Sequence, residues 1–345
     1  MLEALHIPAP PKDVAEEMRA LVDAKTKPQG SLGRVEDLAV QMAVAQGGLD
    51  LDTRACLVLF AGDHGLVGEG VSAWPADVTA QMVQNFLAGG AAANAFARTH
   101  DAGVIVADAG VAGPLPDHPD LHRARIRQGT RNARHEDALT VAEVTAALQF
   151  GADLAAQAAR DHGVVALGEM GIGNTSTAAL LAHAVAEIDL AKLTGPGAGL
   201  DPDGVAQKLE VLRDCARRRP GPLDPLDALA AFGGLEIAAL CGAIIGAAAA
   251  RRVVLVDGFI ASAAALLVLS ARSEVAAHLI FGHLSHEPGH RAMMRALEVR
   301  PLLDLDLRLG EGSGALLALP LLRAAAAMVR EMATFDSAGV SGKAD

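Results

Sequence analysis

Short apolar runs alternate with longer, Ala- and Leu-rich stretches through the middle of this 345-residue chain. The runs are rich in Val, Leu and Ile, and each is followed within two residues by Gly or Asp. Uninterrupted runs of this kind are typical of strands that are buried on both faces of a parallel sheet. We therefore predict five strands, at 55–60, 103–107, 164–167, 253–256 and 278–281.

The stretches between the runs are rich in strong helix formers. They predict helices at 77–98, 140–161, 175–188, 203–219, 235–249 and 261–269. A repeated alternation of strand and helix is typical of the doubly wound α/β fold. The predicted fold class is therefore α/β, with a Rossmann-like, mostly parallel sheet.

The two ends of the chain lack this alternation. Helices are predicted at 11–21, 35–46 and 314–334, the last interrupted by Pro320, and no strand pattern accompanies the terminal ones. We predict two domains on this basis. Residues 35–300 would form the α/β domain that binds the ligands, and residues 1–34 together with 301–345 would form a small helical domain.

Composition and charge exclude several classes of protein. Hydrophobic residues make up 51% of the chain, which is far from the composition of a disordered protein. A net charge of −12 and an aromatic content of 3% argue against a nucleic-acid binder. The longest uncharged apolar runs, 238–250 and 258–271, are shorter than the roughly 20 residues of a membrane span, and no secretory signal begins the chain. We expect a cytoplasmic enzyme without a membrane span.

Polar residues follow the predicted strands at the edge where an open parallel sheet binds its ligands. Together they predict a lined crevice; they are Asp63, His64, Asp108, Glu169, Asp257 and His283. A metal site is not predicted, because the three cysteines are scattered and form no CxxC pair. His283, His286 and His290 have ligand-like spacing, but Pro288 and Gly289 are expected to keep this segment a loop.

The most informative segment is a glycine-rich turn at 168–176, which joins a predicted strand to a predicted helix. Free backbone N–H groups, hydroxyls and the helix dipole would meet there, and this is the composition of an anion site. An ordinary helix cap is the alternative, although it needs fewer glycines. The residues expected to bind a phosphate are Gly171, Gly173, Asn174, Thr175 and Ser176.

Two further glycine clusters carry candidate charges. The cluster at 194–201 contains Gly197 and precedes Lys208, a candidate cation for a phosphate whose alternative role is that of a solvated helix lysine. The cluster at 307–315 holds Glu311 between Gly310 and Gly312. A carboxylate in such an apolar turn can act as a general base, although an exposed Glu in a glycine turn is equally compatible with the spacing.

Taken together and in order, these segments resemble the nicotinate-nucleotide:5,6-dimethylbenzimidazole phosphoribosyltransferase family. The resemblance covers residues from about 25 to 340. It is carried by the segments 27–33, 61–65, 70–72, 78–83, 168–175, 194–201, 232–236, 256–260, 287–290 and 309–314.

The resemblance implies a homodimer, no cofactor and no metal. It implies that the substrates are nicotinate mononucleotide and 5,6-dimethylbenzimidazole, and that Glu311 is the general base with Glu169 as a second acidic residue. The 168–176 turn and Lys208 would bind the phosphate, and Ser72 and Gln81 would flank the benzimidazole. The sequence departs from the family at Trp74, which predicts a differently shaped base pocket.

Three other functions are compatible with parts of the sequence. The segment 253–257 resembles the start of the binding motif of a diphosphate-dependent phosphoribosyltransferase, but the residues that should follow are absent. A non-catalytic nucleotide-binding protein of the same fold would not need both Glu169 and Glu311. The third is a phosphoribosyltransferase of the same fold that uses a different base.

Overall fold

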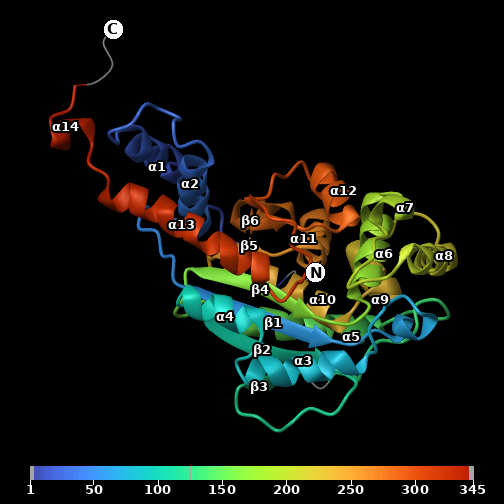
Figure 1. The fold of residues 1–345 in the computed structure, drawn as a ribbon. Helices are drawn as coiled ribbons and strands as arrows, with labels where there is room; N and C mark the ends of the chain where they lie inside the picture. Colours follow the sequence, from blue (N-terminus) through green and yellow to red (C-terminus); the bar gives the residue numbers. More distant parts are fainter. Residues whose placement is uncertain (1–3, 125, 342–345) are drawn as a thin grey trace.

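A six-stranded parallel sheet forms the centre of the computed structural model, which describes residues 4–124 and 126–341 (Figure 1). The spatial order is β3-β2-β1-β4-β5-β6. From β1 the chain adds β2 and β3 on one side, and then adds β4, β5 and β6 on the other, so the strand order reverses between β1 and β4. This confirms the predicted Rossmann-like fold class. The strands are β1 (Ala55–Gly62), β2 (Gly103–Gly110), β3 (Leu121–Arg123), β4 (Val164–Met170), β5 (Val253–Val256) and β6 (Leu279–Phe281).

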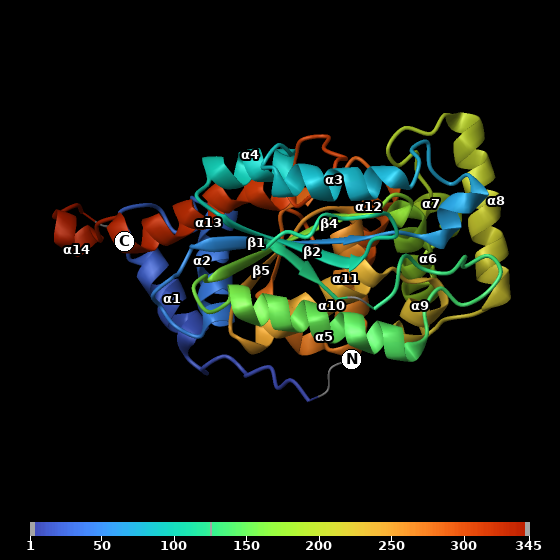
Figure 2. The ribbon, with the colours of Figure 1, turned by 90° about the horizontal axis from the view of Figure 1, so that it is seen from below.

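Alternate residues of each strand face two separate hydrophobic cores. In β1, Cys56, Val58 and Phe60 belong to one core, while Leu57 and Leu59 belong to the other. Both faces are apolar because helices cover both, which is why the sequence shows continuous runs rather than a polar–apolar alternation. Figure 2 shows α3 (Asp77–Leu87), α4 (Ala92–Thr99) and α13 (Ser313–Glu331) on one side of the sheet, and α5 (Val141–Ala158) and α10 (Leu235–Ala249) on the other.

The helices of the sheet domain follow the prediction with two kinds of difference. The single helix expected at 77–98 is divided into α3 and α4, because Gly89 has a φ of +77° and ends the first. Short elements without a strong pattern were not predicted, namely α7 (Leu190–Leu193), α9 (Pro225–Phe232), β7 (His283–Leu284) and β8 (Leu303–Asp304). The others are α3 (Asp77–Leu87), α4 (Ala92–Thr99), α5 (Val141–Ala158), α6 (Asn174–Ala186), α8 (Pro202–Arg218), α10 (Leu235–Ala249) and α11 (Phe259–Ala271), with 3₁₀ turns η1 (Gly65–Glu69) and η2 (Ser273–His278).

Two expectations about proline were wrong. Pro288 does not prolong a loop but begins the helix α12 (Pro288–Ala296), where the missing N–H of proline costs no hydrogen bond. Pro320 lies inside α13 (Ser313–Glu331) without ending it. By length and composition α13 could also cross a membrane, but 56% of its most apolar window is buried here, as in the core helix of a globular domain.

The terminal helices lie side by side. α1 (Val14–Asp23) packs on α2 (Arg34–Gln46), and α13 contacts both, while α14 (Phe335–Ala338) follows at the end of the described chain (Figure 1). The backbone N–H of Thr26 donates to Ala333 at 3.0 Å and thereby joins the two ends. A boundary at residue 34 would separate α1 from α2, and the division into two domains stays a prediction.

Helices α5 and α10 cross with their backbones in contact. A Cβ atom at Gly242 would overlap the carbonyl oxygen of Leu148, and one at Gly151 would overlap that of Ala239. Neither glycine has a φ in the left-handed region, so glycine is required at both positions because the two backbones approach closely and not because of its backbone conformation.

Gly242→Ala is therefore expected to lower the free energy of unfolding by about 2 kcal/mol or more. This loss would occur although the helix propensity of alanine is better than that of glycine by about 1 kcal/mol. The midpoint of urea unfolding measures the change. Gly68→Ala is the matched control, because a Cβ at Gly68 meets no atom within 4 Å. Equal midpoints for the two variants would contradict the packing argument.

Candidate active site

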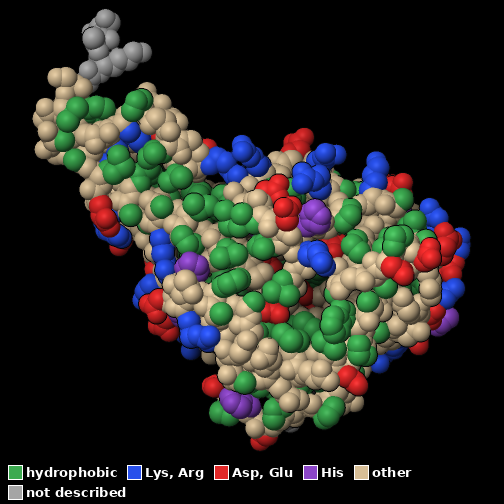
Figure 3. Space-filling model, viewed as in Figure 1, with side chains coloured by type: hydrophobic (Ala, Val, Ile, Leu, Met, Phe, Trp, Pro, Cys, Tyr) green, Lys and Arg blue, Asp and Glu red, His purple; other side chains and the backbone are tan. Residues whose placement is uncertain are grey.

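A cavity of about 450 Å³ opens at the carboxyl ends of β4, β5 and β6, beside the point where the strand order reverses. This is where open α/β sheets bind their ligands, and the volume is in the range of small-molecule sites. The face in Figure 3 is hollowed near its centre, with hydrophobic, acidic and basic side chains around the opening. Among the lining residues are Ser72, Trp74, Glu169, Gly171, Gly173, Asn174, Thr175, Gly197, His283, Glu287, Arg308 and Glu311.

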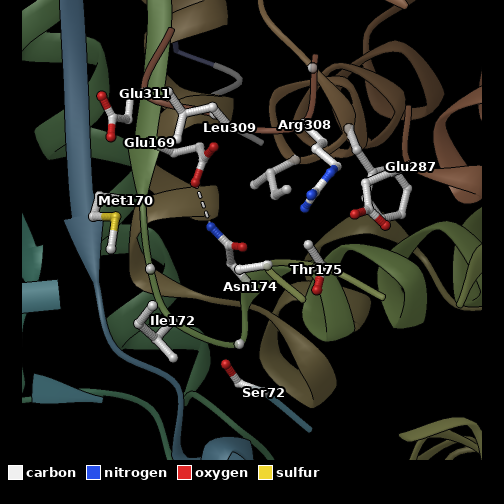
Figure 4. A pocket seen from close by; sticks show the side chains of 18 of the residues that line it. Ser72, Glu169, Met170, Ile172, Asn174, Thr175, Glu287, Arg308, Leu309 and Glu311 are labelled. Atoms are coloured by element: carbon white, nitrogen blue, oxygen red, sulfur yellow. Dashed lines mark hydrogen bonds between the residues drawn. The ribbon is translucent and has the colours of Figure 1, made fainter. Parts of the chain in front are cut away.

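Glu169 and Glu311 lie together at one end of the cavity (Figure 4). Glu169 is near the end of β4, and the backbone N–H of Glu311 donates to its carbonyl oxygen at 3.2 Å. Glu311 itself has a φ of +63° and stands between Gly310 and Gly312, whose φ values are +87° and +74°. Three successive left-handed residues make the tight turn that brings the two carboxyl groups together, and such backbone strain is often found at functional sites.

Burial and neighbouring charges change the acidity of both groups. Burial, followed by the charges of Asp257 and Glu236, raises the pKa of Glu169 to about 8, so this carboxyl is protonated at neutral pH. Asn174 partly opposes the shift by donating a hydrogen bond from its amide to Glu169. The pKa of Glu311 is also raised, first by burial, while the backbone N–H of Ala93 at 3.4 Å opposes the rise.

Asp257 supports the turn that carries Glu311. Its two carboxylate oxygens accept hydrogen bonds from the backbone N–H groups of Gly312 at 3.2 Å and Ala315 at 3.0 Å. Gly312 immediately precedes α13 and Ala315 lies in its first turn, where a carboxylate also meets the positive end of the helix dipole. Asp257 therefore anchors the turn from below and does not line the cavity.

The glycine-rich turn lies at the start of α6, as predicted. Gly173 has a φ of +91°, and Gly171, Gly173, Asn174 and Thr175 all line the cavity. Backbone N–H groups at a helix start favour an anion. Ser176 was also expected to face the ligand, but its side chain is fully buried and outside the lining, because the helix turns it inward.

Lys208 lies directly behind this turn. Its ammonium donates to the hydroxyl of Thr175 at 2.8 Å and to the carbonyl of Gly195 at 3.2 Å. The residue is only 1% exposed, and burial lowers its pKa to about 8, so it remains charged at neutral pH. Lys208 thus lies beside the predicted anion turn, as part of its support rather than of the lining, and its role in phosphate binding stays a prediction.

Two charged residues of the cavity were not predicted to bind the substrates. Arg308 and Glu287 lie near Thr175, at the end opposite Glu169 and Glu311 (Figure 4). Burial raises the pKa of Glu287, and the nearby Lys208 opposes the rise. Arg308 could have been found, because it stands three residues before Glu311 in the same glycine cluster. The cavity thus has an acidic end and an opposite end, called the cationic end here, where Arg308 and Lys208 outnumber the carboxyl of Glu287, whose raised pKa favours the neutral form.

The apolar wall of the cavity comes from α3 and the segment before it. Ser72 lines the cavity as expected, but Gln81 is exposed and does not. Val78 and Met82 line it instead, because residues four apart share one face of a helix and Gln81 lies beside that face. Trp74 is 51% exposed at the opening, and its indole N–H donates to the carbonyl of Ala198 at 3.0 Å.

Most of the polar residues expected in a crevice are placed elsewhere. Only Glu169 and His283 line the cavity, and Asp257 caps α13 as described above. Asp63 and Asp108 accept hydrogen bonds from backbone N–H groups, at 2.8 Å from Ala112 and 2.8 Å from Val111. His64 pairs with Glu236 beneath the surface. Within residues 4–124 and 126–341, His, Cys, Asp and Glu form no group of three or more that could hold a metal ion.

Comparisons with known proteins identify relatives along almost the whole chain. A family model described as phosphoribosyltransferase matches residues 7–340. A protein of Ralstonia nicotianae named nicotinate-nucleotide–dimethylbenzimidazole phosphoribosyltransferase is 52% identical over 340 residues, which are 96% of this chain and 95% of the relative. A protein of the same name from Cupriavidus taiwanensis is 49% identical over 336 residues, 96% of this chain and 97% of the relative. A crystal structure of the enzyme of that name from Thermus thermophilus has a TM-score of 0.91 at 43% identity, over 96% of this chain and 99% of that chain.

Proposed function

Since the chain belongs to the nicotinate-nucleotide–dimethylbenzimidazole phosphoribosyltransferase family, it is a pentosyltransferase of cobalamin synthesis, and we propose that the cavity holds both substrates of the transfer. The phosphoribosyl group of nicotinate mononucleotide moves to 5,6-dimethylbenzimidazole with inversion at C1′. The products are α-ribazole 5′-phosphate and nicotinate. The observation that carries this assignment of the cavity is its division into an acidic end and a cationic end.

The acidic end suits the reacting carbon. One nitrogen of the benzimidazole attacks C1′, and the bond from C1′ to the pyridine nitrogen breaks with its electron pair going to that nitrogen. Nicotinate therefore leaves without a proton and without a metal ion. Glu311 takes the N–H proton of the benzimidazole, and its carboxylate stabilises the positive charge that develops on the ribose, while Asp257 holds the turn that carries Glu311. Glu169, protonated below pH of about 8, can donate its O–H to a ribose oxygen.

The cationic end suits the 5′-phosphate. The residues of the 171–175 turn line the cavity, Lys208 supplies a positive charge from behind the turn, and Arg308 supplies another at the surface. A phosphate monoester carries nearly two negative charges, so one or two cations beside a helix start compensate it. The flat base can pack against the apolar wall formed by Trp74, Val78 and Met82, with the hydroxyl of Ser72 beside it.

A chromatographic assay for nicotinate and α-ribazole 5′-phosphate tests the assignment, with nicotinate mononucleotide and a panel of benzimidazoles, purines and phenols as substrates. We expect both products in equal amounts with 5,6-dimethylbenzimidazole. Consumption of phosphoribosyl diphosphate in the presence of Mg²⁺ would favour the diphosphate-dependent enzyme instead. Binding of the nucleotide without nicotinate release would favour a non-catalytic protein.

The homodimer remains a proposal that rests on the family resemblance, and the cytoplasmic location remains a proposal from the sequence. Light scattering of the purified chain after size-exclusion chromatography measures its mass in solution. A mass twice the 35.3 kDa of the chain would support the dimer.

The pH profile should have an alkaline limb near pH 8. Below this pH Glu169 is protonated and Lys208 is charged; above it Glu169 gains a negative charge beside Glu311 while Lys208 loses its positive one. Both changes weaken nucleotide binding, so kcat/KM for nicotinate mononucleotide should fall with a slope between −1 and −2 on logarithmic axes. Glu169→Gln imitates the protonated acid and should leave a slope near −1. A flat wild-type profile from pH 7 to 9.5 would contradict both assignments.

A further inference from the structure

Two segments that carry the family resemblance have no role in the transfer as described, and they meet in space. His64 follows β1, and Glu236 lies in the first turn of α10. His64 Nε2 and Glu236 Oε1 are 2.7 Å apart, and the two side chains are 1% and 0% exposed. Burial disfavours the charged imidazole, yet contact with Glu236 raises its pKa. Such a buried pair is costly to desolvate and contributes little to stability by itself.

The pair fits because the residues around it are glycines. A Cβ atom at Gly62 would lie 2.8 Å from Glu236 Oε2, and one at Gly234 would lie 2.5 Å from His64 Cε1. At Gly171 the Cβ would lie 3.1 Å from His64 Nε2. Gly171 lines the cavity, so the glycine-rich turn that begins there packs directly on the pair.

The pair also reaches the helix that the turn begins. His64 Nδ1 lies 2.9 Å from the hydroxyl of Thr177, in the first turn of α6. From the other side, the hydroxyl of Thr79 on α3 accepts a hydrogen bond from the backbone N–H of Ile172 at 3.2 Å. The turn is thus fixed by side chains below and beside it, none of which reaches the cavity.

We infer that His64 and Glu236 are positioning residues, which hold the 171–174 turn and the start of α6 in the geometry that binds the nucleotide phosphate. This inference rests on the proposed role of the turn in the transfer. The pair touches neither the reacting carbon nor the base. Its loss should therefore lower the affinity for nicotinate mononucleotide. At a pH where Glu169 stays protonated it should leave the chemical step almost unchanged, since the charge of Glu236 also helps to raise the pKa of Glu169.

Thr177→Val and Glu236→Gln test the inference, since each nearly keeps the size of the side chain. Thr177→Val removes the hydroxyl bonded to His64 Nδ1, and Glu236→Gln removes the charge that strengthens the bond to His64 Nε2. We expect the KM and the calorimetric Kd of nicotinate mononucleotide to rise about tenfold, while kcat and the KM of the base stay within about twofold. Thr177→Ser restores the hydroxyl and should restore the affinity. Thr145→Val, on the exposed face of α5, is the matched control and should have no effect.

Unchanged nucleotide affinity in both folded variants would overturn the inference, as would a fall in melting temperature with no change in KM. Thr177→Val removes only a hydroxyl and keeps the test usable if Glu236→Gln does not fold. Calorimetry separates this inference from the proposed function. If the wild-type chain binds the nucleotide without releasing nicotinate, the proposed transfer is wrong, but the Kd values of the variants can still be compared. If the wild-type chain does not bind the nucleotide, both the proposed function and this inference are wrong.

Discussion

Glu311→Gln is expected to lower kcat for nicotinate release by about 10²–10⁴-fold, with little change in the KM of either substrate. The amide has nearly the shape of the carboxylate but cannot take the proton of the benzimidazole. It also removes a negative charge from the place where the ribose becomes positive. Because burial already raises the pKa of Glu311, removing its charge should leave the melting temperature at pH 7 unchanged or higher. A low kcat could then not be attributed to loss of folding.

Glu298→Gln is the matched control for this variant. Glu298 is also a glutamate in the left-handed region, with a φ of +55°, but it lies outside the cavity. Its replacement should leave both kcat and KM at the wild-type values. Turnover by Glu311→Gln close to that of the wild type, with both substrates saturating, would remove Glu311 from the mechanism and direct attention to Glu169.

Lys208→Met should raise the KM of nicotinate mononucleotide by about 100-fold and change kcat much less. The ammonium is the buried cation behind the anion turn and holds the hydroxyl of Thr175, so its loss removes both charge and support. A hydrogen bond to a charged group contributes about 1.5–3 kcal/mol, which corresponds to roughly 10–150-fold in affinity. Methionine fills most of the volume of the lysine and so limits the damage to packing.

The nucleoside that lacks the phosphate provides the decisive comparison. If Lys208 acts on the phosphate, nicotinate riboside should be used equally poorly by the wild type and by Lys208→Met. Lys192→Met, at an exposed lysine of α7, should behave as the wild type does with both substrates. An equal loss of activity toward nucleotide and nucleoside would assign Lys208 a purely structural role.

The fold could be predicted from the sequence wherever local pattern and tertiary environment agree. β1, β4 and β5 have continuous apolar runs because both of their faces are covered, and their predicted starts match the structure. β3 was missed because the three residues Leu121–Arg123 contain no run; pairing with β2 makes them a strand. Such pairing is a long-range effect that a local pattern does not contain.

The site could be predicted in part, for a similar physical reason. Glycine-rich turns are local features, so the turns with Gly173 and Glu311 were found. What a side chain at a strand end faces depends on its neighbours from other segments, and therefore His64 and Asp257, expected in the crevice, proved to lie beneath it. Gln81 also does not line the cavity, because α3 turns Val78 and Met82 toward it and places Gln81 beside that face.

The hydrogen bond between Trp74 and Ala198 connects two separate loops across the opening of the cavity. The chain contains one tryptophan and no tyrosine, so nearly all of its intrinsic near-ultraviolet emission comes from this single indole. Because Trp74 lines the cavity and is 51% exposed, a ligand that binds there is expected to change the exposure of the indole to water. The protein therefore carries its own optical reporter at the entrance, and stopped-flow fluorescence can follow the order in which the two substrates arrive without a label.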